Sequence, residues 1–160
     1  MNQSSERDKE MIGLIYGCIK IDGNIKFEMK EKEFKLKEKF LYEHLLNFKV
    51  EKSVKILNIL NEYQLFGLDT DENISFFCIS TKSFPIRISN DFLLEMKNKM
   101  NSIFSIFKEN KRRMKELNEL LNEQFKLFNN VTHNKDIFIE CQDLIETRKQ
   151  ETQKNIGKIF

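Results

Sequence analysis

Two apolar runs joined by a short polar connection constrain this chain more than any other feature. Residues Tyr63–Asp69 and Ile74–Ser80 are rich in Phe, Leu and Ile, and only the polar stretch Thr70–Asn73 separates them. Strands joined by so short a turn pair antiparallel, because a parallel pair needs a long crossover. The chain is therefore expected to contain an antiparallel sheet.

Other segments supply candidate strands for the same sheet. Met11–Lys20 is typical of a strand buried on both faces, Asp22-Gly23 is a turn signal, and Asn24–Met29 alternates apolar and polar residues as its partner. Ser53–Asn61 fits a strand or a helix, since its apolar residues satisfy both periods. The sequence thus predicts two hairpins and leaves one segment open.

Helical spacing dominates the remaining segments. The first apolar helix face consists of Phe40, Leu41, His44, Leu45 and Phe48. The lone proline, Pro85, stands where a helix can begin, and the helical pattern runs from Arg87 to Phe107. A charged break or a solvated stretch over Lys108–Lys115 leads into a second amphipathic helix that ends at Phe128. Strands first and grouped helices later indicate an α+β fold with helices covering the sheet.

Composition excludes several classes of protein. The 160 residues include 27 Lys and Arg against 25 Asp and Glu, so a net charge of +2 gives no support for a nucleic-acid partner. No apolar run reaches the roughly 18 residues that span a bilayer. The first ten residues are polar and lack the pattern of a secretory signal. Three widely spaced cysteines, an odd number, favour reduced thiols in the cytosol.

Catalytic and metal-binding patterns are weak. The oxygens of Asp69, Asp71 and Asn73 are spaced like the start of a calcium loop, but Ile74 and Ser80 replace the required Gly and Glu, so a solvated turn is expected. His44 and His133 have no partner at ligand spacing, and Cys18 and Cys78 fit buried strand positions. We therefore expect no catalytic residue, no metal and no cofactor, and a protein that is not an enzyme.

One stretch resembles longin domains. Tyr63–Met96 contains a strand pair with a small polar turn, then Phe84 and Pro85, a short spacer, and a helix carrying Phe92, Leu93, Leu94 and Glu95. Met11–Lys20 is similar to the first longin strand. The resemblance implies a profilin-like, five-stranded antiparallel sheet with one helix on one face and two on the other.

A second stretch, Asp136–Phe160, resembles the N-terminal half of an R-SNARE motif. In that register the layer positions are Phe138, Cys141, Ile145, Arg148, Thr152, Asn155 and Ile159. The central-layer Arg of the family would fall three residues after Ile159, so we expect either a chain truncated before it or a longin protein without a working SNARE motif. The implied organisation is a disordered extension over 1–10, a longin domain over 11–128, a linker over 129–135 and a partial SNARE helix over 136–160.

The two resemblances together imply a function in vesicle trafficking. The longin domain would regulate and sort, and the C-terminal segment would pair with partner SNARE helices in membrane fusion, on the cytoplasmic face of ER, Golgi, endosomal or vesicle membranes. Coat or tethering proteins are further expected partners. Membrane contact is expected only through a segment beyond this chain. The resemblance also implies a groove around Phe40, Leu41, Leu45, Val54 and Ile56, where residues 136–160 would dock.

Two alternatives remain open at this stage. The first is a longin-like adaptor or tethering-complex subunit, in which the apolar surface is a permanent subunit interface and 136–160 is a structural helix. The second is a phosphate- or lipid-binding module that uses Lys111, Arg112 and Arg113, a basic cluster that otherwise reads as a solvated helix end.

Overall fold

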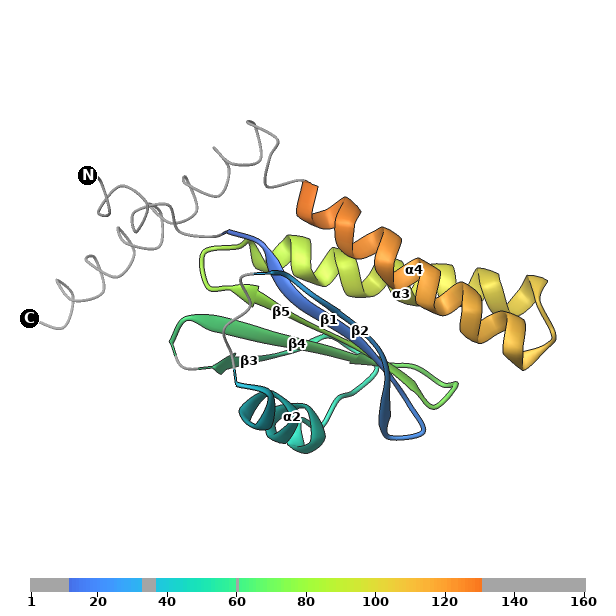
Figure 1. The fold of residues 1–160 in the computed structure, drawn as a ribbon, viewed down its shortest axis with the longest axis horizontal. Helices are drawn as coiled ribbons and strands as arrows, with labels where there is room; N and C mark the ends of the chain where they lie inside the picture. The colour runs from blue at the N-terminus through green and yellow to red at the C-terminus, as the bar shows by residue number, and fades with distance from the viewer. Residues whose placement is uncertain (1–11, 33–36, 60, 131–160) are drawn as a thin grey trace, which may run out of the picture.

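The computed structural model describes residues 12–32, 37–59 and 61–130, which form one five-stranded antiparallel sheet and three helices (Figure 1). In chain order the elements are β1 (Leu14–Ile21), β2 (Asn24–Lys30), α2 (Glu38–Asn47), β3 (Lys55–Ile59), β4 (Tyr63–Asp69), β5 (Ile74–Thr81), α3 (Ile86–Ile106) and α4 (Asn110–Asn130). The strand order across the sheet is β2-β1-β5-β4-β3, with every neighbouring pair antiparallel. The two edges of the sheet are therefore β2 and β3.

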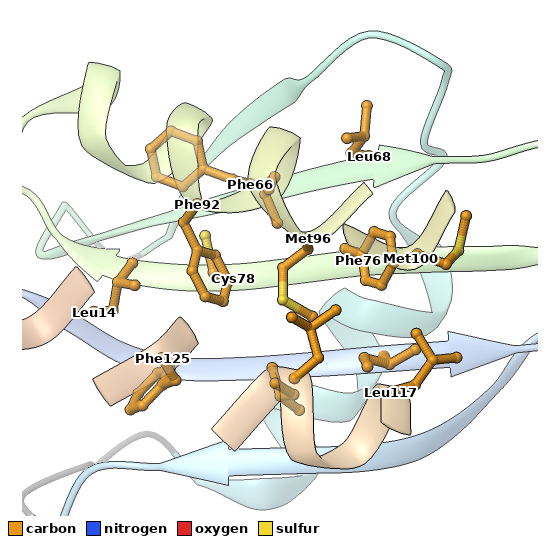
Figure 2. Close-up of a cluster of buried hydrophobic side chains, with 14 of the residues drawn as sticks. Leu14, Phe66, Leu68, Phe76, Cys78, Phe92, Met96, Met100, Leu117 and Phe125 are labelled. Atoms are coloured by element: carbon orange, nitrogen blue, oxygen red, sulfur yellow. The ribbon is translucent and has the colours of Figure 1, made fainter. Parts of the chain in front are cut away.

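Helices cover both faces of this sheet. In Figure 1, α2 lies on one face and the pair α3 and α4 lies on the other. The α3/α4 side holds the larger apolar cluster, in which Phe66 and Phe76 from the sheet meet Phe92, Met96 and Phe125 from the helices (Figure 2). The α2 side holds a smaller cluster, whose fully buried members include Tyr16, Leu41, Leu45, Leu65 and Phe77. The central strands are buried on both sides because each face has its own helical cover.

The turn of the α3–α4 hairpin is held by a polar side chain. Pro85 occupies the N-cap position of α3, where the sequence predicts that a helix can begin. At the far end, the Arg113 guanidinium donates from Nε to the Phe107 carbonyl at 2.6 Å and from Nη2 to the Phe104 carbonyl at 2.9 Å. These bonds satisfy carbonyls that the last turn of a helix leaves unpaired. The hairpin turn is therefore stabilised by a residue of the next helix.

Asn129 fixes the other end of α4 to the sheet. Its Oδ1 accepts from the Leu14 amide at 2.8 Å, and its Nδ2 donates to the Leu14 carbonyl at 2.8 Å and to Glu31 Oε1 at 2.7 Å. The amide of Asn129 thus pairs with both backbone groups of the first residue of β1. This contact fixes the place where the chain leaves α4.

The predicted fold class is confirmed. The α+β architecture, the five antiparallel strands, and one helix on one face against two on the other are all present. The open segment Ser53–Asn61 contains a strand, Lys55–Ile59. Of the two alternatives for Lys108–Lys115, the break is confined to the residues between Ile106 and Asn110, and the remainder is a largely exposed part of α4, in agreement with a solvated stretch. Asn129 and Asn130, expected in the linker, belong to α4.

The proposed extension over 1–10, the remainder of the linker and the SNARE-like segment 136–160 lie outside the described residues.

Candidate functional site

The edge strand β3 exposes an apolar side chain on each face of the sheet. Leu57 is 40% exposed and Ile56 is 42% exposed. Leu57 pairs with Leu65, which belongs to the cluster under α2, whereas Ile56 pairs with Phe66, which belongs to the cluster under α3 and α4. Since directly paired residues share a face, Leu57 and Ile56 are exposed on opposite sides of the same strand.

The flank of α2 turned away from β2 is directed toward the β3 half of the sheet. Tyr42 donates its hydroxyl to the Glu28 carboxylate of β2 at 3.1 Å, so its side of the helix faces β2. Phe40 and His44 lie roughly 160° around the helix from Tyr42, on the flank toward the β3 half of the sheet. Their rings contact each other at a centroid distance of 4.2 Å. We call Phe40, His44 and Leu57 the α2–β3 surface.

Close packing between α2, the connection that follows it and the sheet supports the α2–β3 surface. Leu41 and Leu45 of α2 are fully buried against the sheet. The connection from α2 to β3 packs over Gly67 of β4, where an added Cβ would lie 2.6 Å from Cε1 of Phe48 and would also collide with Val50. Only a glycine lets this connection lie so close to the strand.

The buried Tyr16 hydroxyl stabilises the position of α2 through the same carboxylate. Tyr16 donates to Glu28 Oε2 at 2.8 Å. Burial, together with Cys18 and Glu28 nearby, raises the pKa of Tyr16 well above its usual range, so the hydroxyl stays neutral and remains a donor. The Nζ atom of Lys30 lies 3.9 Å from Oε2 of Glu28 and 3.7 Å from Oε1 of Glu38. These contacts join β1, β2 and α2 into one polar cluster.

The residues expected to line one groove divide between two sides of the sheet. Phe40, Leu41 and Leu45 belong to the α2 side. Val54 packs against the cluster under α3 and α4, and Ile56 faces that side as well. Leu57, which was not among the expected groove residues, takes the place of Ile56. The signal for it was the two-residue period of a strand, because Leu57 shares its face with the buried Ile59.

The polar turn between β4 and β5 lines a shallow depression with the β1–β2 turn, formed by Asp22, Gly23, Asp69, Asn73 and Ser75. The Asp69 carboxylate accepts from the Thr70 amide and the Ser75 hydroxyl, both at 2.9 Å. The Lys52 ammonium bonds to Asp71 and holds the pKa of that carboxyl below its usual value. No group of three metal-ligating side chains occurs within residues 12–32, 37–59 and 61–130. The Asp69 and Asp71 carboxylates of the turn are therefore already paired with groups of the protein.

The two described cysteines are buried. Burial raises the pKa of the Cys18 thiol to about 12 and raises the pKa of Cys78 well above its usual value. Both thiols are therefore protonated at neutral pH, and a protonated thiol is a poor nucleophile. His44 packs against Phe40. His133 and the seven layer positions of the SNARE-like segment lie beyond the part of the chain that the structure describes.

No helix in the described ranges is long and apolar enough to cross a bilayer. A comparison with protein-family profiles gives no match, and a search of curated proteins gives no significant one.

Proposed function

We propose that this chain is an R-SNARE-type vesicle trafficking protein. The folded domain regulates and sorts, and residues 136–160 pair with partner SNARE helices in membrane fusion on the cytoplasmic face of ER, Golgi, endosomal or vesicle membranes. The support is the layered arrangement of the domain, with one helix between β2 and β3 and two after β5, on opposite faces of one antiparallel sheet. This is the arrangement that the resemblance to longin domains implies.

The α2–β3 surface is the candidate site of regulation. It joins an exposed Leu57 at an unpaired strand edge to the Phe40 flank of a firmly seated helix. In the heptad register, the SNARE-like segment presents Phe138, Ile145 and Ile159 on one stripe. Docking of that stripe on the surface would remove apolar area from water and would compete with pairing. A closed form favoured tenfold would lower the apparent affinity for partner helices about tenfold.

Pairing of the SNARE-like segment is the direct test of the proposed function. The full chain is mixed with recombinant trimers of Q-type SNARE helices, and complex formation is followed by circular dichroism and gel filtration. Pairing is expected to add helix and to fail in the layer variant Ile145→Asp. The matched control Leu144→Asp places the same charge one residue away from a layer position and is expected to retain pairing. Failure of the parent chain to pair, or equal loss in both variants, would contradict the proposal.

A second candidate function is a subunit of an adaptor or tethering complex. It is favoured by β3, which exposes apolar side chains on both faces as a permanent interface strand would. Sedimentation of the full chain separates the candidates. A monodisperse monomer at micromolar concentration supports the SNARE-type protein, and concentration-dependent association supports the subunit.

A further inference from the structure

The turn of the α3–α4 hairpin extends past the sheet. In Figure 1 both helices continue beyond the ends of the strands, and their connection forms an isolated tip. The apolar contacts of the hairpin with the main cluster reach only to Phe104 on α3 and begin at Met114 on α4. Between these residues, Ile106 is 69% exposed, the highest value among the exposed large hydrophobic side chains of the described residues.

Basic residues are concentrated around this tip. Residues 97–115 contain seven of the 27 Lys and Arg of the chain but only one of the 25 Asp and Glu, Glu109. This stretch therefore has a net charge of +6, and the rest of the chain has a net charge of −4. The small overall charge thus conceals an uneven distribution of charge along the sequence.

Two of the three residues in the basic cluster already contact the hairpin itself. Arg113 bonds to the α3 carbonyls and lies over the Phe104 ring at 4.4 Å. Arg112 lies over the Phe107 ring at 4.9 Å and pairs with Glu116 at 3.3 Å. Both guanidinium groups thus contribute to the structure of the tip itself.

The three lysines of the tip are the cations left for a partner. Lys108, Lys111 and Lys115 are exposed, and none has an ion-pair partner within the described residues. They are close in sequence to the exposed Ile106 and the half-buried Phe107, which together we call the apex. An exposed apolar side chain accompanied by flexible ammonium groups matches the interface of an anionic bilayer, where acyl chains lie beneath negative head groups.

We propose that the tip of the α3–α4 hairpin docks on the surface of an anionic lipid bilayer. Ile106 enters the interfacial layer, and Lys108, Lys111 and Lys115 contact the head groups. A bilayer fits better than a nucleic acid, because the apex presents an aliphatic side chain and Arg112 covers the nearest aromatic ring.

Docking at the tip leaves the opposite end of α4 away from the bilayer. The 21 residues of α4 span about 30 Å, so the end held by Asn129 lies that far from the tip. The proposal does not depend on the SNARE assignment, since it rests on residues 97–115 alone. It also differs from the expectation that membrane contact requires a segment beyond this chain.

Flotation of the full chain with vesicles tests the proposal. Vesicles of phosphatidylcholine with 30% phosphatidylserine are expected to bind the chain at low salt, and binding is expected to weaken as salt rises. Pure phosphatidylcholine is expected to bind little. The variant Lys108→Glu/Lys111→Glu is expected to lower partitioning by at least about tenfold. Its control, Lys39→Glu/Lys49→Glu, changes the net charge equally at exposed sites away from the tip and is expected to bind like the parent.

A tryptophan reporter tests whether the apex enters the membrane. The chain contains no Trp, so Ile106→Trp provides a single emitter at the apex. Its emission is expected to shift to the blue on anionic vesicles and to be quenched by brominated lipid. Leu127→Trp, at a 55% exposed position of α4 away from the tip, is expected to show neither change.

Any one of the following outcomes would overturn the proposal. They are no binding to anionic vesicles at low salt, binding that the tip charge reversals leave unchanged, and Ile106→Trp emission that does not respond to lipid. Tighter binding to a polyanion such as heparin than to vesicles, unaffected by Ile106→Asp, would assign the tip to another kind of partner and would also overturn it. Thermal melts of each variant confirm that the fold is retained.

Discussion

The two edges of the sheet are built in opposite ways. The outer strand β2 alternates charged residues such as Lys26, Glu28 and Lys30 with half-buried apolar ones. Glu28 bonds to Tyr16 and Tyr42, so this edge is tied to β1 and α2. The outer strand β3 has only five residues and pairs only with β4.

The difference shows which edge is available to a partner. Natural sheets protect their edges with charges, irregularities or covering elements, because an unpaired strand can template association. β2 has the charges and the cover, whereas β3 exposes Ile56 and Leu57 on its two faces. The short length of β3 limits association at this edge. The molecule therefore leaves open the edge that borders the α2–β3 surface.

Weakening the packing of α2 should lower the free energy of unfolding most, because α2 is the helix that covers one face of the sheet. Leu45→Ala removes a fully buried side chain from the cluster beneath α2. The free energy of unfolding is expected to fall by about 3 kcal/mol, as measured by urea denaturation. Leu46→Ala, at a 64% exposed position one residue on, is expected to change it by less than about 0.5 kcal/mol. Equal losses in the two variants would show that α2 is not seated as described.

Alkaline pH should lower the free energy of unfolding through the buried thiols of β1 and β5. Burial raises the folded-state pKa values of Cys18 and Cys78, so between pH 9 and these values only the unfolded state releases the thiol protons. Stability is present below the unfolded pKa and is lost as pH rises above it. Raising the pH from 8 to 10 is expected to lower the free energy of unfolding by about 2–3 kcal/mol. Cys18→Ala should reduce this dependence of the free energy of unfolding on pH, as measured by urea denaturation at pH 8 and pH 10. An unchanged dependence would contradict its attribution to the buried thiols.

Adding a methyl group under the α2–β3 connection should affect the open edge selectively. Gly67→Ala forces Phe48 and Val50 to move, with an expected cost of about 2 kcal/mol. Gly17→Ala, where the new Cβ would lie 3.2 Å from the Phe125 ring beneath α4, should cost less, about 1 kcal/mol. Hydrogen exchange should show the loss of protection in β3 for the first variant alone. A larger cost at Gly17 would reverse this ranking.

Removing single charges should have the smallest effect and should distinguish the edges. Glu28→Gln weakens the bond from the buried Tyr16 hydroxyl and is expected to cost about 1 kcal/mol. Glu51→Gln breaks the exposed pair with Lys55 beside β3 and should cost less than about 0.5 kcal/mol. Urea denaturation at neutral pH measures the free energy of unfolding of both variants. Equal losses would contradict the contrast between the β2 edge, which is tied to its neighbours, and the open β3 edge.

Sequence reasoning was most successful where the pattern was local. The hairpin of β4 and β5 follows from two apolar runs and a four-residue turn, and the start of α3 follows from Pro85. The segment around β3 stayed ambiguous because its pairing with β4, which no local period encodes, decides its conformation. That pairing also decides which of Ile56 and Leu57 faces α2. The expected groove consequently contained the wrong one of the two.

Long-range polar contacts could not be predicted. Arg113 appeared to belong to a charged break, but it reaches back to the carbonyls of α3 and allows α4 to begin at Asn110. Asn129 appeared to belong to a linker, but it pairs with Leu14, which lies 115 residues away in the sequence. The SNARE-like layer positions remain predictions, since they lie outside the described ranges.

Hydrogen exchange over residues 136–160 in the full chain tests most directly the central claim, that the α2–β3 surface receives this segment. Leu57→Asp and Ile56→Asp form a matched pair, since the two residues are neighbours in β3 with nearly equal exposure on opposite faces. The account predicts protection of 136–160 in the parent chain, its loss in Leu57→Asp and its retention in Ile56→Asp. An unprotected segment in the parent chain, or the same response in both variants, would contradict the claim.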